Sequence, residues 1–93
     1  MSALAIHHVP GEGFFIDEGG RRIAELTYAA AGDHRVVADH TWVADELRGQ
    51  GIARQLLDAL VAWARQSGTR IVPRCSYIVR EVANDASLRD VVA

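Results

Sequence analysis

The sequence contains no lysine, because all ten of its basic residues are arginines. This absence excludes a lysine Schiff base, and it excludes a phosphate loop of the Walker type, whose last glycine is followed by lysine. A single cysteine, Cys75, excludes an internal disulfide framework. The chain also lacks an apolar run of membrane-spanning length, and its first residues lack the basic start and the length of a signal peptide. We therefore expect a cytoplasmic protein without a membrane partner.

The rest of the composition is that of an ordinary folded domain. Of the 93 residues, 49% are hydrophobic and 24% are charged, which suits one modest core and predicts one domain over residues 1–93. A net charge of −2 speaks against a broad electrostatic attraction to nucleic acid or to an anionic membrane. We expect a monomer or a weak dimer.

The first half of the chain has the composition of strands separated by turns. Gly19-Gly20 forms a two-residue turn that tolerates positive φ, and Ala31-Gly32-Asp33-His34 forms a second turn. The predicted strands are Gly13–Glu18, Arg22–Ala30 and Arg35–Val43. They predict an antiparallel three-stranded meander.

Alternation along these strands predicts which side chains share a face of the sheet. In the second strand Ala24, Leu26 and Tyr28 share one face, and Arg22 leads onto that face from the turn. In the third strand His40 is expected to share a face with Trp42, Ala38 and Val36, which keeps a core histidine open as an alternative to a catalytic one.

The segment before these strands, Met1 to Gly11, predicts an N-terminal arm or a short edge strand. It carries the pair His7-His8, but no third metal ligand follows at a useful spacing. We interpret the pair as solvated surface and expect no metal site.

The second half of the chain changes to the period of a helix. Apolar residues recur at spacings of three and four, at Ile52, Leu56, Ala59, Leu60 and Trp63. Arg54 and Asp58 form an i,i+4 pair, and Gly68 is a natural residue to end the helix.

Two further elements follow this helix. Thr69–Val72 is a short buried strand ended by Pro73, and a right-handed crossover places it parallel to Arg35–Val43. Ser76–Asn84 is predicted to be a second helix with Tyr77, Ile78 and Val82 as its buried stripe, and Leu88–Val92 is an apolar tail that we expect to pack on the core. The predicted fold class is α/β, in the mixed α+β form.

The segment Leu47–Arg54, with the sequence Leu-Arg-Gly-Gln-Gly-Ile-Ala-Arg, stands at the mouth of the first helix. A helix start has unpaired N–H groups and the positive end of the helix dipole, and glycine lets an anion approach them closely. The segment therefore predicts a cradle for a diphosphate. A dinucleotide fingerprint does not fit, because Arg54 stands where glycine or alanine is needed. A simple helix entrance with glycines for a tight turn remains an alternative.

This segment resembles the Arg/Gln-x-x-Gly-x-Gly/Ala motif of the Gcn5-related N-acetyltransferase (GNAT) superfamily, matched here by Arg48, Gly51 and Ala53. Thr41-Trp42-Val43 precedes it at a strand end, and Pro73-x-Cys75-x-Tyr77-Ile78 follows it. With these segments, the chain from Phe14 onward resembles the small single-domain GNAT-like proteins, which include the YjdJ-type proteins. The resemblance implies a minimal GNAT-like fold.

The resemblance also implies that acetyl-CoA binds where the strand before the motif parts from its neighbour. The backbone of Trp42 and Val43 would pair with the pantetheine arm, and N–H groups of the motif would receive the diphosphate. Arg48 and Arg54 would add charge-assisted bonds. The implied coenzyme-binding residues are Trp42, Val43, Arg48, Gly49, Gln50, Gly51, Ile52, Ala53 and Arg54.

Three residues are candidates for the chemistry of acetyl transfer. Cys75, at the start of the last helix and beside Arg74, would take the acetyl group transiently or line the thioester pocket; a buried structural cysteine is the alternative. His40 is the candidate base, with a hydrogen-bonded core histidine as the alternative. Tyr77 is either a general acid toward the departing thiolate or a packing residue.

Some positions depart from the small family's pattern. Glu81 stands where an aromatic residue is usual, and Asp85-Ala86 replaces a His-Pro or Asn-Pro pair. These changes affect side-chain contacts from the last helix but not the phosphate cradle. With few residues before the first strand, the cleft is expected to lack the lid of longer relatives, which suits an exposed peptide amine or an acceptor supplied by a partner.

The sequence thus supports an acetyl-CoA-dependent N-acetyltransferase acting on an unidentified amine. The alternative is an acyl-CoA-binding or sensing module with little turnover. A third hypothesis is an interaction domain with a degenerate site, which would be indifferent to coenzyme A.

Overall fold

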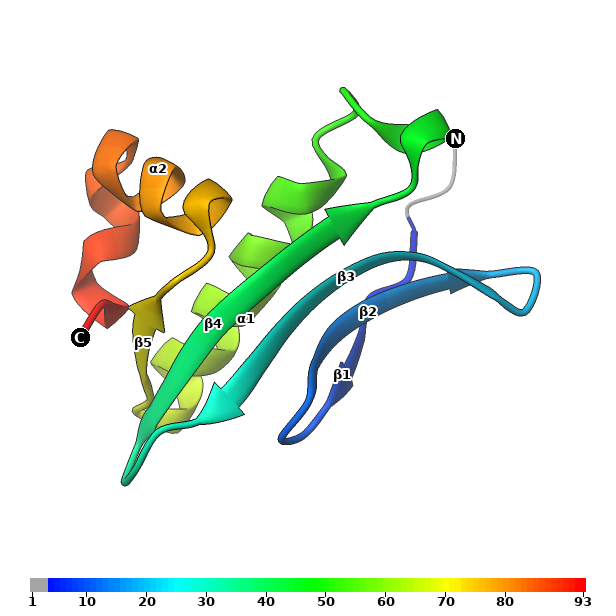
Figure 1. Ribbon diagram of the computed structural model, residues 1–93. Helices are drawn as coiled ribbons and strands as arrows, with labels where there is room; N and C mark the ends of the chain where they lie inside the picture. Colours follow the sequence, from blue (N-terminus) through cyan, green and yellow to red (C-terminus); the bar gives the residue numbers. More distant parts are fainter. Residues whose placement is uncertain (1–3) are drawn as a thin grey trace.

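A computed structural model describes residues 4–93, so the first three residues of the expected N-terminal arm lie outside the described part. The elements are β1 (His7–Val9), β2 (Gly13–Glu18), β3 (Arg21–Ala30), β4 (Arg35–Val43), the 3-10 helix η1 (Asp45–Leu47), α1 (Ile52–Ser67), β5 (Arg70–Pro73), α2 (Ser76–Asn84) and the 3-10 helix η2 (Ala86–Val91). They form a mixed sheet with the strand order β1-β2-β3-β4-β5 (Figure 1).

The predicted α+β architecture is confirmed. The sheet has five strands, one more than the three strands of the predicted meander and the predicted parallel strand together. Strands β1 to β4 are antiparallel neighbours, and β5 runs parallel to β4 after the α1 crossover. The additional strand is β1, the short edge strand allowed for in the N-terminal segment. Strand β5 begins one residue later than predicted, at Arg70.

The predicted turn between the first two strands of the meander is present. Gly19 and Gly20 have φ of 59° and 77°, which are the positive values that a two-residue hairpin turn of the right twist requires. The glycines therefore fix the register of β2 against β3.

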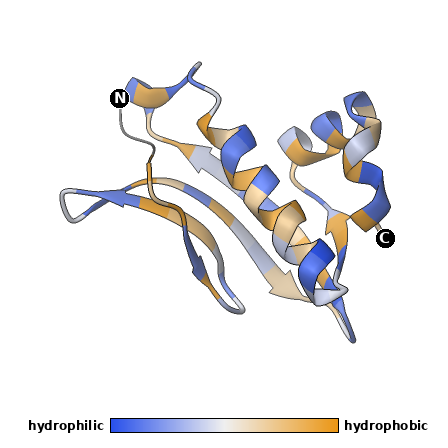
Figure 2. Cartoon of the chain, turned by 180° about the vertical axis from the view of Figure 1, so that it is seen from behind, coloured by the Kyte–Doolittle hydropathy of each residue, from blue (hydrophilic) through white to orange (hydrophobic). Residues whose placement is uncertain are grey.

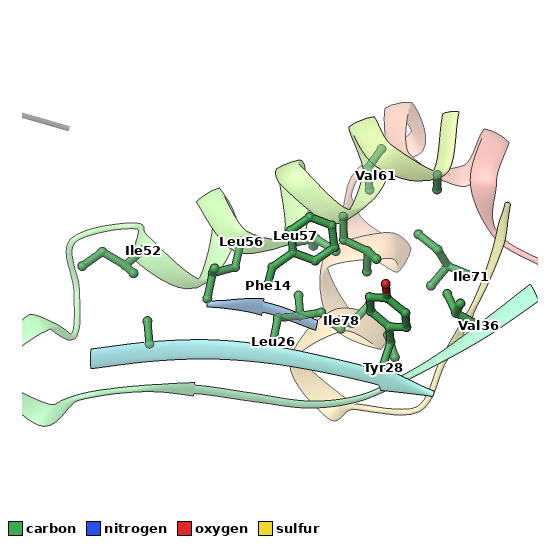
Figure 3. Close-up of a cluster of buried hydrophobic side chains, with 14 of the residues drawn as sticks. Phe14, Leu26, Tyr28, Val36, Ile52, Leu56, Leu57, Val61, Ile71 and Ile78 are labelled. Carbon is green, nitrogen blue, oxygen red and sulfur yellow. The ribbon is translucent and has the colours of Figure 1, made fainter. Parts of the chain in front are cut away.

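Helix α1 crosses behind the sheet in Figure 1, and α2 lies beside β5 at the edge of the sheet. Figure 3 shows Leu56 and Leu57 of α1 packed toward Phe14 and Leu26 of the sheet. The buried residues of α1 are Ile52, Leu56, Leu57, Leu60, Val61 and Ala64. The predicted stripe is thus confirmed at its centre, while Ala59 and Trp63 are half-buried at its margin. Gly68 ends the helix with φ of 69°, as predicted.

The C-terminal third packs against the same core. Helix α2 has the predicted bounds, and Ile78 is its buried residue, with Tyr77 and Val82 half-buried. Leu88 and Val91 of η2 are buried, which confirms the apolar tail. Figure 2 shows hydrophobic and hydrophilic bands alternating along both helices. Within residues 4–93, neither helix has the length and apolarity that crossing a membrane requires.

A β-bulge in β4 contradicts the predicted position of His40. Thr27 pairs with His40 while Tyr28 pairs with Ala38, so Asp39 is an extra residue in β4. One extra residue moves every following side chain to the opposite face of the sheet. His40 and Trp42 are therefore exposed, whereas Ala38 is buried on the side of α1.

A second bulge contradicts the predicted position of Arg22. Asp17 pairs with Arg22 while Ile16 pairs with Ala24, so Ile23 is the extra residue and is buried. Arg22 is thereby placed over the ring of Phe15, 4.0 Å from its centroid, on the face away from α1.

His8 is not the solvated side chain that was expected, although His7 is exposed. The His8 ring stacks on Phe14 with a centroid distance of 4.2 Å, and its Nε2 lies 2.6 Å from the hydroxyl of Tyr28. Trp63 of α1 meets the edge of the same cluster. The histidine thus attaches the edge strand β1 to the core.

Candidate functional site

A cavity of about 540 Å³ opens between the carboxyl end of β4, the start of α1 and the side of α2. Its lining residues are Thr41, Trp42, Val43, Leu47, Arg48, Gly49, Gly51, Ile52, Ala53, Arg54, Tyr77 and Arg80. The size falls within the range of small-molecule sites.

The cavity exists because β4 and β5 are paired along only part of β4. The parallel ladder runs from Arg35 to Ala38 of β4 and ends at Pro73 of β5. The N–H groups of Arg74 and Cys75 then donate to the carbonyl of Ala38, and the chain turns into α2. Among the described residues, no strand continues the pairing beside residues 39–43 of β4. That edge of β4 is therefore available to another extended molecule, as Figure 1 shows where β4 extends past β5.

The glycine-rich loop forms the second wall of the cavity. Gly49 and Gly51 have φ of 82° and 74°, values that side chains with a Cβ rarely adopt. A Cβ built on either glycine would meet no atom within 4 Å, so both backbones border open space.

Helix α1 starts directly after Gly51. Within residues 4–93, no side chain caps its first turn. The N–H groups of Ile52, Ala53 and Arg54 thus lie at the positive end of a helix with 16 residues. This arrangement fits an anion.

The structure brings the predicted coenzyme-binding residues together around this cavity. Trp42 and Val43 come from β4, and the residues from Arg48 to Arg54 come from the loop and α1, with Gln50 as the exception that does not line it. Trp42 is 37% exposed, which makes it an exposed large hydrophobic residue at the edge of the cavity.

Two arginines of the loop and helix have different partners. Arg48 is exposed, forms an i,i+3 pair with Asp45 at 3.3 Å and lies 3.5 Å from the carbonyl of Val43. Arg54 is held by Asp58 at 2.9 Å, by Glu81 at 3.1 Å and by Asp85. The hydrogen bonds that Arg54 donates to these carboxylates, with the bond to Asp58 first, raise the pKa of Arg54. The guanidinium of Arg54 is thus committed to α2 and its C-terminal end.

Cys75 is half-buried at the point where β4 and β5 part, with its Sγ 3.4 Å from Oγ1 of Thr41. Burial acts to raise the pKa of the thiol, but the Thr41 hydroxyl and the backbone N–H groups of Ile78 and Tyr77 outweigh it, so the pKa is lowered. Cys75 does not itself line the cavity, whereas its neighbour Thr41 does.

His40 lies on the other face of β4, outside the cavity lining. Its Nε2 is 3.2 Å from Oε2 of Glu25 on β3, and its side chain is 53% exposed. The bulge at Asp39 is the physical reason why His40 and Cys75 are not on one face.

Two residues of α2 complete the lining, and Arg80 was missed in the sequence. Tyr77 and Arg80 are three residues apart, so they lie on neighbouring turns of one helix face. Burial, followed by the charge of Glu81, raises the pKa of Tyr77, which keeps its phenol protonated. The spacing of three residues from Tyr77, already considered a site residue, is the signal that could have identified Arg80 in the sequence. Residues 4–93 contain no group of three or more side chains that could hold a metal ion.

The chain is similar to proteins of one family. The profile of the family described as GCN5-related N-acetyl-transferase matches residues 13–91. A GCN5-like protein from Staphylococcus aureus, solved by NMR in solution, is 35% identical over 100% of this chain and 91% of that chain, with a TM-score of 0.80. No curated protein matches the chain at a significant level.

Longer proteins share the fold at lower identity. A GNAT family N-acetyltransferase from Escherichia coli in complex with CoA is 24% identical over 66% of this chain and 38% of that chain, with a TM-score of 0.58. A GNAT family acetyltransferase from Elizabethkingia anophelis with acetyl-CoA bound is 18% identical over 64% of this chain and 40% of that chain, with a TM-score of 0.56. These two likenesses show the fold alone.

Proposed function

The chain belongs to the GCN5-related N-acetyltransferase family, and we propose that it transfers the acetyl group of acetyl-CoA to an amine. The observation that carries the proposal is the cavity in which the unpaired edge of β4 faces the uncapped start of α1. The CoA and acetyl-CoA complexes of the E. coli and Elizabethkingia proteins support the choice of ligand.

In this proposal, the two walls of the cavity hold the two halves of the coenzyme. The pantetheine arm, which carries amide groups, pairs with the backbone of Trp42 and Val43 as an added strand. The diphosphate accepts hydrogen bonds from backbone N–H groups between Gly49 and Arg54, Gln50 included, and from the side chain of Arg48. The guanidinium of Arg54 holds α2 in place, and its backbone N–H contributes to the cradle.

Acetyl transfer then occurs where β4 and β5 part. The lone pair of an amine attacks the thioester carbonyl, a C–N bond forms, and the C–S bond breaks to release the CoA thiolate. In our proposal, His40 takes the proton of the amine, and the protonated phenol of Tyr77 supplies one to the thiolate. Because His40 lies on the face away from α1, the acceptor approaches from that uncovered face.

Cys75 offers a second route to the same product. Its thiolate, favoured by the lowered pKa, attacks the thioester carbonyl, the C–S bond to CoA breaks, and the CoA thiolate leaves. The amine then attacks the acetyl group on Cys75, a C–N bond forms, and the Cys75 thiolate is released. Thr41, which contacts both Cys75 and the cavity, links the thiol to the coenzyme.

The alternative proposal is an acyl-CoA-binding module with little turnover. It is favoured by one observation: neither His40 nor Cys75 lines the cavity that would hold the coenzyme. The two proposals share the coenzyme-binding site and differ in whether a side chain is placed to take part in acetyl transfer.

Mass spectrometry of the intact protein distinguishes them. After incubation with acetyl-CoA, native conditions report the bound coenzyme and denaturing conditions report an acetyl group on the protein. The same mixtures are assayed with peptide amines and polyamines as acceptors.

For the enzyme, combining Cys75→Ala with His40→Ala abolishes acetyl transfer while coenzyme binding is kept, and the two single variants show which route carries the transfer. Coenzyme retention with no transfer to any acceptor favours the binding module. No retention of coenzyme under native conditions contradicts both proposals and favours an interaction domain.

A further inference from the structure

The cavity has a cationic residue on the α2 side that the glycine-rich motif does not supply. Arg80 lines the cavity opposite the start of α1, and its side chain is exposed. Across residues 4–93, Arg80 forms no ion pair with a carboxylate. Its charge is therefore free for a ligand.

Arg80 is also oriented by its neighbour on the helix. Its guanidinium carbon lies 5.7 Å from the ring centroid of Tyr77, within the range of a cation–π contact. Tyr77 lines the same cavity and is half-buried, so it offers a fixed surface to the flexible arginine. This contact reduces the side-chain freedom that Arg80 would lose on binding a ligand.

Arg54 shows the opposite arrangement. Three carboxylates, of Asp58, Glu81 and Asp85, surround its guanidinium. A phosphate would have to displace these anions before it could bind that side chain. Because Glu81 and Asp85 belong to α2 and its C-terminal end, the same ion pairs fix the helix that carries Arg80.

We propose that Arg80 is a phosphate-binding residue for the coenzyme, and that Arg54 acts through its carboxylate partners as a positioning residue for α2. The inference rests on the proposed function and adds a second cationic wall to that site. An arginine suits this role because its guanidinium offers several N–H donors to phosphate oxygens at once.

The test compares ligands with and without phosphate groups. The Kd values of CoA, dephospho-CoA and pantetheine are measured by calorimetry for the unmodified protein and for Arg80→Gln. Loss of one charge-assisted contact is expected to weaken CoA binding about tenfold. Pantetheine binding, which involves no phosphate, is expected to stay unchanged.

Dephospho-CoA identifies the phosphate involved. An equal loss for CoA and dephospho-CoA assigns Arg80 to the diphosphate, and a loss confined to CoA assigns it to the 3′-phosphate. Either result supports the inference. The salt dependence of CoA binding is also expected to become shallower in Arg80→Gln, because one ionic contact is gone.

Arg35→Gln is the matched control, since it removes the same charge from an exposed position at the opposite end of β4. The inference is overturned if Arg80→Gln binds CoA as the unmodified protein does, or if pantetheine binding weakens equally. The proposed function fails in a different way, namely if the unmodified protein binds no CoA. Thermal unfolding of each variant checks that the fold is intact.

Discussion

Gly51 combines two demands that no other residue type meets easily. Its φ of 74° is strained for residues with a Cβ, and its backbone borders the cavity at the first N–H groups of α1. The backbone strain caused by a substitution lowers the stability of the fold, whereas a side chain placed in the open space obstructs the ligand. A substitution here affects both, and the two effects need a control that separates them.

Gly51→Val is expected to lower stability by about 1–3 kcal/mol from backbone strain and to weaken CoA binding strongly, because the branched side chain obstructs the phosphates. Gly68→Val is the matched control. Gly68 ends the same helix with φ of 69° and also borders open space, but it does not line the cavity. Calorimetry should find both variants destabilised and only Gly51→Val impaired in binding. Equal CoA affinity in the two variants would contradict the proposed cradle.

His8 is the residue whose charge the fold opposes. Burial lowers its pKa below the ordinary 6.5. The hydrogen bonds point the same way: the Tyr28 hydroxyl accepts from the N–H of Gly11, so its proton is available for a neutral Nε2 of His8. A protonated His8 would present a donor where an acceptor is needed.

Because the folded protein binds this proton less tightly than the unfolded chain, the stability that His8 contributes is complete above pH 6.5. It is lost as the pH falls through the lower pKa of the folded state. His8→Phe keeps a ring against Phe14 but cannot titrate, so its Tm should fall less between pH 7.5 and pH 5. Since 1 kcal/mol shifts Tm by about 4–8 °C in a domain of this size, scanning calorimetry can resolve the difference. His7→Phe, at the exposed neighbour, should retain the pH dependence of the unmodified protein.

At the level of elements, the contact between α1 and α2 depends on charges as well as on apolar packing. Arg54 in the first turn of α1 reaches Glu81 and Asp85. Asp85 also caps η2, since its carboxylate accepts hydrogen bonds from the N–H and hydroxyl of Ser87. Glu81 and Asp85, two positions where the chain departs from the pattern of the small family, thus share one partner, Arg54.

The hydrogen bonds from Ser87, followed by the bond from Arg54, lower the pKa of Asp85 from 3.8 to about 2. A lowered pKa of a carboxyl group means stability that is present above the unfolded value and is lost as pH falls through the folded value. Unfolding monitored by circular dichroism should therefore show a component between about pH 4 and pH 2 that Asp85→Asn lacks. Asparagine caps a helix about as well as aspartate, so the variant mainly removes the charge.

Glu18→Gln is a suitable control for this experiment, because Glu18 lies exposed beside the Gly19-Gly20 turn. If the acid titration of Asp85→Asn overlays that of the unmodified protein, the carboxylate does not stabilise the junction of α1 and α2. If Glu18→Gln shows the same change as Asp85→Asn, the effect reflects net charge and not this contact.

The sequence predicts elements better than it predicts the faces of long strands. The bounds of α2, the glycine that ends α1 and the parallel placement of β5 follow from spacing, capping and crossover rules, which act locally. The bulges at Ile23 and Asp39 leave no local signal, because they depend on how neighbouring strands are paired. For this reason His40 was placed on the wrong face.

The site also combines residues that are contiguous in the sequence, which could be predicted, with residues that only the tertiary structure brings together. The proposed phosphate cradle is contained in a continuous segment, so its residues could be predicted together, and all of them except Gln50 line the cavity. Two of the three carboxylates around Arg54, those of Glu81 in α2 and of Asp85 just after it, lie 27 and 31 residues further along the chain, and only the tertiary structure brings them there. Arg80 enters the cavity for the same reason.

At the scale of the whole molecule, the sheet is divided into a closed half and an open half. Residues Val36–Ala38 of β4 are paired on both sides, by β3 and by β5, while residues 40–43 have β3 alone within the described part of the chain. Backbone N–H groups without a partner exchange with solvent more readily than those in a ladder. The bound coenzyme, in our proposal, completes the open half.

Amide hydrogen exchange with and without CoA tests this division directly. We expect slower exchange in residues 39–43 of β4 and at the start of α1, and little change from Arg35 to Ala38, whose N–H groups are already paired. At a CoA concentration of about 100 times Kd, mass action adds about 2.7 kcal/mol to the stability of the folded state, which should slow global exchange as well. Pantetheine, which lacks the diphosphate, should protect β4 without the start of α1. Protection spread evenly over the sheet, or none in residues 39–43, would mean that the ligand does not add a strand to β4.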